Sequence, residues 1–193
     1  MNRPAAVGVE LPGMRSPAVG FEAPFEMLLA CHERVERMLD LLTRLRSHLT
    51  QIGCDAQAST AAADVMRYFD LAAPQHHLDE EFHVFPAVLA LQDGRLDLLV
   101  YRLKQDHLEM EKSWVQVSKA LARVVDSGFK AWMPFSDAEH THMDAFVAIY
   151  KDHIQNEEGL VYPAAKRALD SEQLQVMSRD MVRRRSGEQS GRG

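Results

Sequence analysis

The sequence predicts an all-α protein folded as an antiparallel, up-and-down four-helix bundle. Apolar residues recur at steps of three and four over four long segments, as on helices that each bury one stripe. Short stretches containing Gly, Asp or Pro separate these segments, and short connections favour antiparallel neighbours. No segment shows the strict alternation of apolar and polar residues that is typical of a half-buried strand.

The first two helices carry polar residues on their stripes. Regular structure is expected to begin near Pro24, and residues 51–55 interrupt the pattern before the second helix. Pro74 lacks an amide donor and should kink or loosen the second helix just before His76. The first stripe is Phe25, Leu28, His32, Val35, Leu39 and Leu42. The second stripe is Ala62, Met66, Phe69, Ala73, His76, Glu80 and His83.

Two more helices follow a linker predicted over 86–94. A loop over 127–134 separates them, and Ser136 or Asp137 is expected to cap the last of the four. The third stripe is Leu96, Val100, Leu103, His107, Met110, Trp114, Val117 and Leu121. The fourth stripe is Met143, Phe146, Tyr150, His153, Glu157 and Leu160. Each of the four stripes therefore contains at least one histidine.

These segments divide the chain into three parts. Residues 1–22 are rich in Pro, Gly, Ala and Val without a sustained period, so we expect a flexible N-terminal extension. The bundle occupies residues 23–166. Residues 167–193 are expected to contain a short C-terminal helix, which can extend from residue 164 to residue 181, and a disordered polar tail over 183–193.

Composition and charge favour a cytoplasmic protein and exclude two classes of partner. No apolar run approaches the roughly 18 residues that cross a membrane, and the start lacks the apolar segment of a secretory signal. Cys31 and Cys54 form no Cys-x-x-Cys pair, so we expect reduced thiols. A net charge of -6 offers no broad basic surface, so neither nucleic acid nor membrane is an expected partner.

One motif occurs twice, at the ends of the second and fourth helices. Residues 76–86 and 153–163 both read His-x3-Glu-Glu-x2-Val-aromatic-Pro. Four helical steps overshoot one turn by only about 40°, so the histidine and the first glutamate of each copy point to the same side. Two such helices that face each other can hold metal ions between them.

Six polar residues on the stripes are the candidate metal ligands. They are His32, His76, Glu80, His107, His153 and Glu157. Burying carboxylates or unpaired imidazoles in a bundle core is costly unless they bind a cation, and this mixture of donors suits iron, manganese or zinc. If both glutamates bridge two ions roughly 3.5 to 4 Å apart, room remains for a solvent bridge and an external ligand.

Residues beside the stripes define a less favoured set of ligands. His77 and Glu81 form an alternative register, and with Glu158 they are otherwise expected to be exposed or to support the ligands from outside. Glu111, four residues after His107, is a weaker candidate for metal contact, and a charge at the edge of the bundle seam is the favoured interpretation.

Residues 24–165 resemble the hemerythrin-like, or HHE cation-binding, family, whose second and fourth helices end in His-x3-Glu-Glu followed by an aromatic residue and proline. The resemblance implies a hemerythrin-like four-helix bundle around a non-haem di-iron centre. It also implies that the six candidate residues bind the two iron ions. Members of the family bind O2 or NO, some as carriers and others as sensors or as factors in nitrosative stress, iron sensing or repair of iron centres.

The sequence departs from the oxygen-carrying members at one position of the third helix. Those members have a second histidine four residues after the first, and here that position is Glu111. Replacing a nitrogen donor by a carboxylate should stabilise ferric iron, which favours redox chemistry or sensing over reversible oxygen carriage. Members that repair iron centres carry an N-terminal region with adjacent cysteines, which this sequence lacks.

The favoured function is a di-iron protein that binds O2 or NO for sensing, storage or redox and nitrosative protection. A metal- and gas-binding protein is favoured over a dedicated enzyme, and a sensor would need a separate protein partner that the sequence does not identify. The alternative is a non-redox module that binds or buffers iron and in which the metal is mainly structural. A bundle used only for protein interaction is disfavoured because all six ligand positions are filled.

Alanine variants test the choice of histidines. His76→Ala and His153→Ala should each lower the iron content of the purified protein well below that of wild type. His142→Ala should leave the iron content unchanged, because His142 lies about 16 Å from His153 along the helix axis. Loss of iron in His77→Ala but not in His76→Ala would establish the alternative register.

Overall fold

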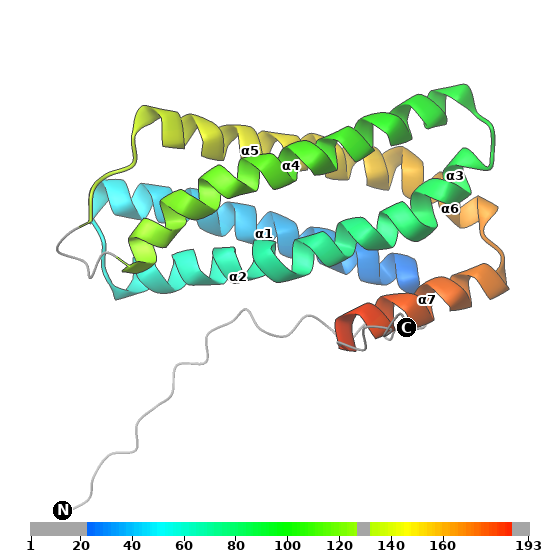
Figure 1. Ribbon diagram of the computed structural model, residues 1–193, viewed down its shortest axis with the longest axis horizontal. Coiled ribbons are helices and arrows are strands. Elements are labelled where there is room, and N and C mark those ends of the chain that lie inside the picture. The colour runs from blue at the N-terminus through cyan, green and yellow to red at the C-terminus, as the bar shows by residue number, and fades with distance from the viewer. Residues whose placement is uncertain (1–22, 127–131, 187–193) are drawn as a thin grey trace, which may run out of the picture.

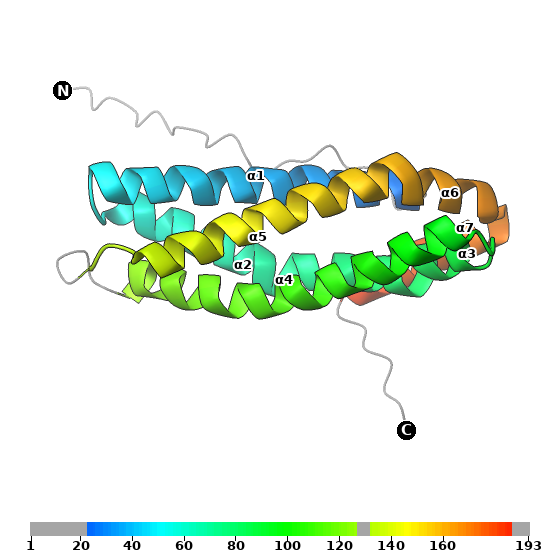
Figure 2. The same ribbon diagram turned by 90° about the horizontal axis from the view of Figure 1, so that it is seen from above.

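The computed structural model describes residues 23–126 and 132–186. Within these residues every regular element is helical, which confirms the predicted all-α class. The four long helices run alternately in opposite directions, as in an up-and-down bundle (Figures 1 and 2). They are α1 (Pro24–Gln51), α2 (Ala56–Asp79), α4 (Gly94–Asp126) and α5 (Asp137–Asn156). The expected extension over 1–22 lies outside the described residues, as does the part of the predicted tail over 187–193.

Shorter elements lengthen the bundle at one end. After α2 come η1 (Glu80–Val84) and α3 (Phe85–Leu89), and after α5 come η2 (Glu157–Val161) and α6 (Tyr162–Ala168). The last element, α7 (Ser171–Ser186), packs against α1 and α2. Among the helices described, none has the length and hydrophobicity of a membrane span.

Side-chain caps fix where two of the long helices begin. Asp55 caps α2, and its carboxylate accepts a hydrogen bond of 2.9 Å from the amide of Ala58. Ser136, one of the two predicted alternatives, caps α5, and Glu139 completes a capping box by accepting from the amide of Ser136. Such caps contribute about 1 kcal/mol each, and they fix the residue at which each helix begins.

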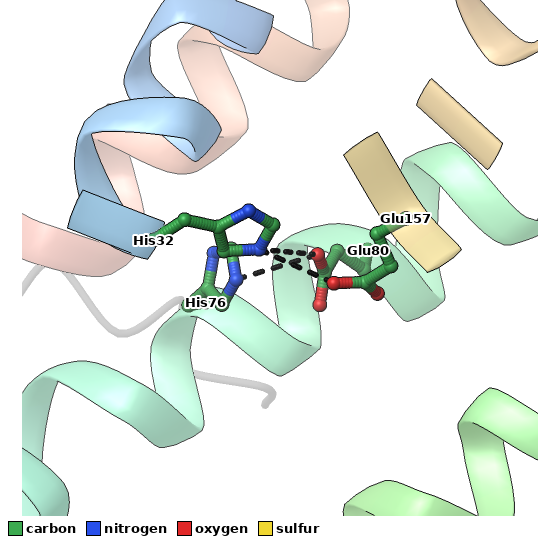
Figure 3. Close-up of side chains that lie close together, drawn as sticks. All are labelled: His32, His76, Glu80 and Glu157. Atoms are coloured by element: carbon green, nitrogen blue, oxygen red, sulfur yellow. Dashed lines mark ion pairs between the residues drawn. The ribbon is translucent and has the colours of Figure 1, made fainter. Parts of the chain in front are cut away.

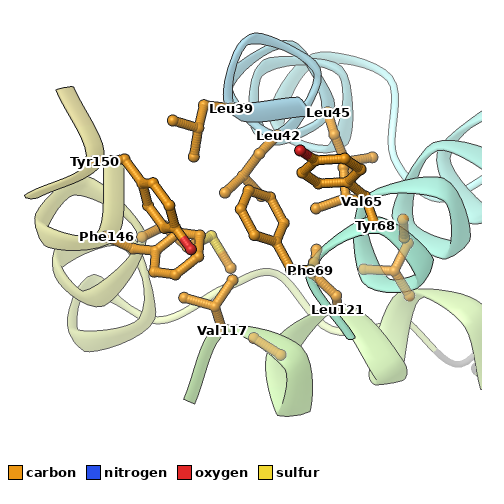
Figure 4. Packing of buried hydrophobic residues seen from close by; sticks show 14 of the residues in the cluster. Leu39, Leu42, Leu45, Val65, Tyr68, Phe69, Val117, Leu121, Phe146 and Tyr150 are labelled. Carbon is orange, nitrogen blue, oxygen red and sulfur yellow. The ribbon is translucent and has the colours of Figure 1, made fainter. Parts of the chain in front are cut away.

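Apolar side chains form two clusters along the bundle. On α1, Leu28 belongs to one cluster and Val35 to the other, with His32 between them. The polar positions of the stripes therefore lie between two apolar regions. The larger cluster includes Leu42, Phe69, Leu121 and Phe146 (Figure 4). The second cluster includes Phe25, Phe85, Leu103, Tyr162, Met177 and Met181.

Each copy of the doubled motif contains a π-helical turn. In η1 the amide of Phe85 donates to the carbonyl of Glu80, five residues earlier. Pro86 follows at once, and in a regular α-helix its ring would clash with the carbonyl four residues before it, which a wider turn avoids. The second copy repeats this arrangement with Glu157, Tyr162 and Pro163.

The structure corrects three details predicted from the sequence. The helix continues beyond Pro86 to Leu89, so the linker is shorter than predicted. The fourth stripe does not include Leu160, which is 52% exposed, whereas Val161 is fully buried because the extra residue in η2 shifts the inward face by one position. The helix α7 continues to Ser186, so residues 183–186 of the predicted polar tail are helical. Pro74 lies inside α2, and the kink predicted there stays a prediction.

A buried carboxylate fastens α7 to the bundle. Asp79 is fully buried and accepts hydrogen bonds of 2.6 Å from both Arg184 and Arg185. One turn further along the motif, His83 Nε2 lies 2.8 Å from Asp180 Oδ2. The last helix thus contacts the first copy of the motif on both sides of its leading glutamate.

Replacing Asp79 with alanine should lower the free energy of unfolding by roughly 3 kcal/mol, because the largely buried Arg185 loses its carboxylate partner and Arg184 keeps only Asp180. Urea unfolding of the metal-free protein, followed by circular dichroism, measures this change. The matched control is Asp64→Ala, because Asp64 pairs with Arg67 at the surface of α2 and should contribute less than about 1 kcal/mol. Equal losses in the two variants would contradict the role of Asp79.

Candidate metal centre

The structure brings the six predicted ligand residues together between the two apolar clusters. Each of these residues is at most 2% exposed. Their ligand atoms form two groups of four, and within a group they lie within 4.8 Å of one another. The first group is His32, His76, Glu80 and Glu157. The second group is Glu80, His107, His153 and Glu157.

The first group joins α1, α2, η1 and η2 (Figure 3). His32 Nε2 lies 3.2 Å from Glu157 Oε2 and 3.8 Å from Glu80 Oε1. His76 Nε2 lies 3.3 Å from the same oxygen of Glu80. Two imidazole nitrogens and one oxygen from each glutamate therefore converge on one small volume.

The second group uses the other oxygen of each glutamate. His107 Nε2 lies 3.4 Å from Glu80 Oε2, and His153 Nε2 lies 3.0 Å from Glu157 Oε1. The two imidazole nitrogens lie 3.1 Å apart. Each carboxylate thus directs one oxygen to each group, which is the arrangement required of a carboxylate that bridges two ions.

Several buried polar atoms of the site lack hydrogen-bond partners among the described residues. They are Glu80 Oε2, both carboxylate oxygens of Glu157 and His76 Nδ1. An unsatisfied buried carboxylate is costly, and a cation shared by these oxygens and the facing imidazole nitrogens would remove that cost. The donors present therefore fit divalent or trivalent metal ions.

Carboxylates outside the two groups orient three of the four histidines. Glu158 Oε1 lies 2.9 Å from Nδ1 of His32, and Glu81 Oε1 lies 2.8 Å from Nδ1 of His107. Asp106 contacts His153 in the same way at 3.4 Å. A carboxylate that accepts from Nδ1 leaves Nε2 free to bind a metal and fixes the plane of the ring.

The charges of the metal-free site are strongly coupled. Burial alone would lower the pKa of His153, but the charge of Glu157 and the hydrogen bond with Asp106 raise it to about 10. Burial would raise the pKa of Glu157, yet the facing imidazolium lowers it to about 2. Burial and the neighbouring histidines lower the pKa of His76 to about 3. The metal-free site therefore combines charged and neutral imidazoles.

Residues of the less favoured set lie outside both groups of ligand atoms. His77 is buried rather than exposed, and its ring stacks on that of His107 with the centroids 3.9 Å apart. It lies outside both groups, while Glu81 supports His107, so the alternative register is not assembled. Glu111 is exposed, because Met110 occupies the inward position of that turn of α4.

The sequence patterns did not identify two polar contacts at the centre. The hydroxyl of Tyr162 donates to Glu80 Oε1 and lies 3.1 Å from His32 Nε2. Burial and the charge of Glu80 raise the pKa of this phenol, so it is protonated in the metal-free protein. Asp106 was also missed, since it lies beside the stripe of α4 and becomes important only through its contact with α5.

Comparison with known proteins agrees with this site. Residues 23–180 match the family model described as the hemerythrin HHE cation binding domain. The chain is also 27% identical over 162 residues to an uncharacterized protein of Haemophilus influenzae, an alignment that covers 84% of this chain and 90% of that protein.

Metal binding should release protons and become stronger as the pH rises. His153 is protonated at neutral pH, and only the neutral imidazole binds a metal. Burial lowers the pKa of His32 and His107, but the charges of Glu157 and Glu80 outweigh it and raise both values. Competition with a chelator, corrected for the protonation of the chelator, should show affinity rising about tenfold per pH unit for each proton displaced.

Acid should correspondingly empty the centre. Three of the four candidate ligand histidines, His32, His107 and His153, have pKa values raised above the usual imidazole value of roughly 6.5, so they are protonated near pH 4 and we expect the metal to leave before that point. Metal content after dialysis at each pH measures the loss. An affinity that does not change with pH, or metal retained at about pH 4, would contradict a histidine-rich site.

Proposed function

Because the chain belongs to the hemerythrin HHE cation-binding family, we propose that it is a non-haem di-iron protein that binds O2 or NO. Its role would be sensing, storage or redox and nitrosative protection. The observation that carries this proposal is the sharing of Glu80 and Glu157 between two groups of imidazoles. Two ions held by common carboxylates are close enough to act on one small ligand.

Each part of the site has a defined task in this proposal. His32 and His76 would hold one ion, His107 and His153 the other, and both glutamates would bind both ions. Imidazole and carboxylate donors suit iron, although manganese or zinc can use the same donors. The bound ions would supply redox chemistry and positions for an external ligand.

The protein surroundings limit which ligand can bind. The donor residues are at most 2% exposed, and apolar clusters lie on both sides of them. A ligand must therefore be small and must leave water with little penalty, as O2 and NO do. The two cysteines, Cys31 and Cys54, form no disulfide among the described residues, which fits a reducing, cytoplasmic location.

A second candidate function is a non-redox module that binds or buffers iron. The observation in its favour is that the six donors come from all four long helices or the turns that extend them. Metal would then cross-link the bundle, and its main effect would be on stability.

Spectroscopy of the iron-loaded protein separates the two functions. The protein is purified after expression with added iron, the metal per chain is measured, and absorption spectra are recorded before and after reduction and exposure to O2 or NO. The di-iron proposal expects about two irons per chain and a spectrum that changes with gas. Metal without a gas response would support buffering, and absence of metal would overturn both functions.

Two adjacent glutamates provide a matched test of bridging. Glu157→Gln should lose both irons, because this carboxylate contacts both groups. Glu158→Gln should retain both irons with affinity weakened by about 10- to 100-fold, because Glu158 contacts only His32 from outside. Loss of a single iron in Glu157→Gln would show that this residue does not bridge.

A further inference from the structure

The hydroxyl oxygen of Tyr162 lies among the donor atoms of the first group. It donates a hydrogen bond to Glu80 Oε1 and lies 3.1 Å from His32 Nε2. The side chain is 2% exposed, and among the described residues its hydroxyl contacts only atoms of the candidate centre. A buried phenol in this position adds a fifth potential donor to the first group.

The spacing of these atoms fits common binding to one ion. Six donors placed about 2.1 Å from an ion lie about 3 Å from their nearest neighbours. The oxygen of Tyr162 is 3.1 Å from His32 Nε2, and that nitrogen is 3.2 Å from Glu157 Oε2. The phenol oxygen therefore stands where a neighbouring ligand of the same ion would stand.

The backbone and the surrounding rings hold Tyr162 in this place. It is the first residue after η2, and its amide donates to the carbonyl of Glu157. Its ring lies nearly parallel to that of His32, with centroids 5.3 Å apart, and edge-on to Phe25 at 5.7 Å. The hydroxyl is thus directed by a π turn and two aromatic contacts.

The doubled motif provides an internal comparison. The residue of the first copy that corresponds to Tyr162 is Phe85, which stacks on His107 of the second group at 5.6 Å but has no hydroxyl. The two groups therefore differ: the first has a phenol oxygen where the second has a bare ring. The centre is chemically asymmetric although the motif is repeated.

We propose that Tyr162 is a ligand of the ion held by His32 and His76, bound through its phenolate oxygen. As the ion binds, the phenol O–H bond breaks, its proton leaves to solvent, and an oxygen lone pair forms the bond to the metal. This inference rests on the metal-binding part of the proposed function. A phenolate favours ferric over ferrous iron, and the second ion, which lacks this ligand, keeps more positions open.

Iron alone is the probe for this ligand. Full-length protein loaded with ferrous iron and oxidised should show a visible charge-transfer band from phenolate to ferric iron. Resonance Raman spectra excited in that band should show phenolate ring modes that shift when the protein is grown with ring-deuterated tyrosine. Tyr162→Phe should lose the band and the ring modes, retain about two irons per chain through the remaining donors, and have a higher midpoint potential.

Tyr68→Phe is the matched control, because Tyr68 is also buried but donates to the backbone carbonyl of Cys31 at 3.2 Å. This variant should keep the band, the ring modes and the iron. Two irons in wild type without phenolate modes would overturn the assignment of Tyr162 and leave the di-iron proposal standing. Modes that persist in Tyr162→Phe would also overturn it, and a wild-type protein that takes up no iron would overturn both.

Discussion

Two glutamate carboxylates lie in the middle of a helical bundle with too few hydrogen-bond partners among the described residues. The other features of the site offset the energetic cost of burying them. An uncompensated buried charge costs several kcal/mol, whereas a whole domain is stable by only about 5–15 kcal/mol. In the metal-free protein the facing imidazoles offset part of this cost by pairing with the carboxylates. The raised pKa of His153, which faces the charge of Glu157, reflects this pairing. The apolar clusters on either side supply the burial that keeps the bundle folded around its polar centre.

The helical period and the repeated motif were sufficient to predict the bundle and to select the six residues that the structure brings together. Both signals are local. A period of three to four residues reports which face of a helix is inward, and the repeat shows that inward histidines and glutamates recur in pairs. The cap at Ser136 was predictable for the same reason, since a serine followed three residues later by Glu139 is itself a local signal.

What the sequence could not supply depends on contacts between helices or on a change of helical phase. Asp106 and Tyr162 matter through atoms on other elements, so no pattern along their own helices identifies them. Steps of three and four from His107 both remain near the core, so the sequence left Glu111 open between metal contact and a charge at the edge of the bundle seam, and only the packing of α4 selects Met110. The prolines of the doubled motif were a sequence signal for the π turns. The shift that each π turn causes in the inward-facing positions is visible only in the three-dimensional structure.

The two π turns also constrain the length of the chain. Each amounts to one residue inserted into a regular helix, so deleting a residue between Glu80 and Phe85 would restore ordinary hydrogen bonding but rotate everything after it by about 100°. The same deletion in the second copy would rotate Tyr162 away from His32. A mutant with a one-residue deletion there would retain every candidate metal-binding side chain and still have a rearranged centre. Sequence changes in these two stretches are therefore better tolerated as substitutions than as changes in residue number.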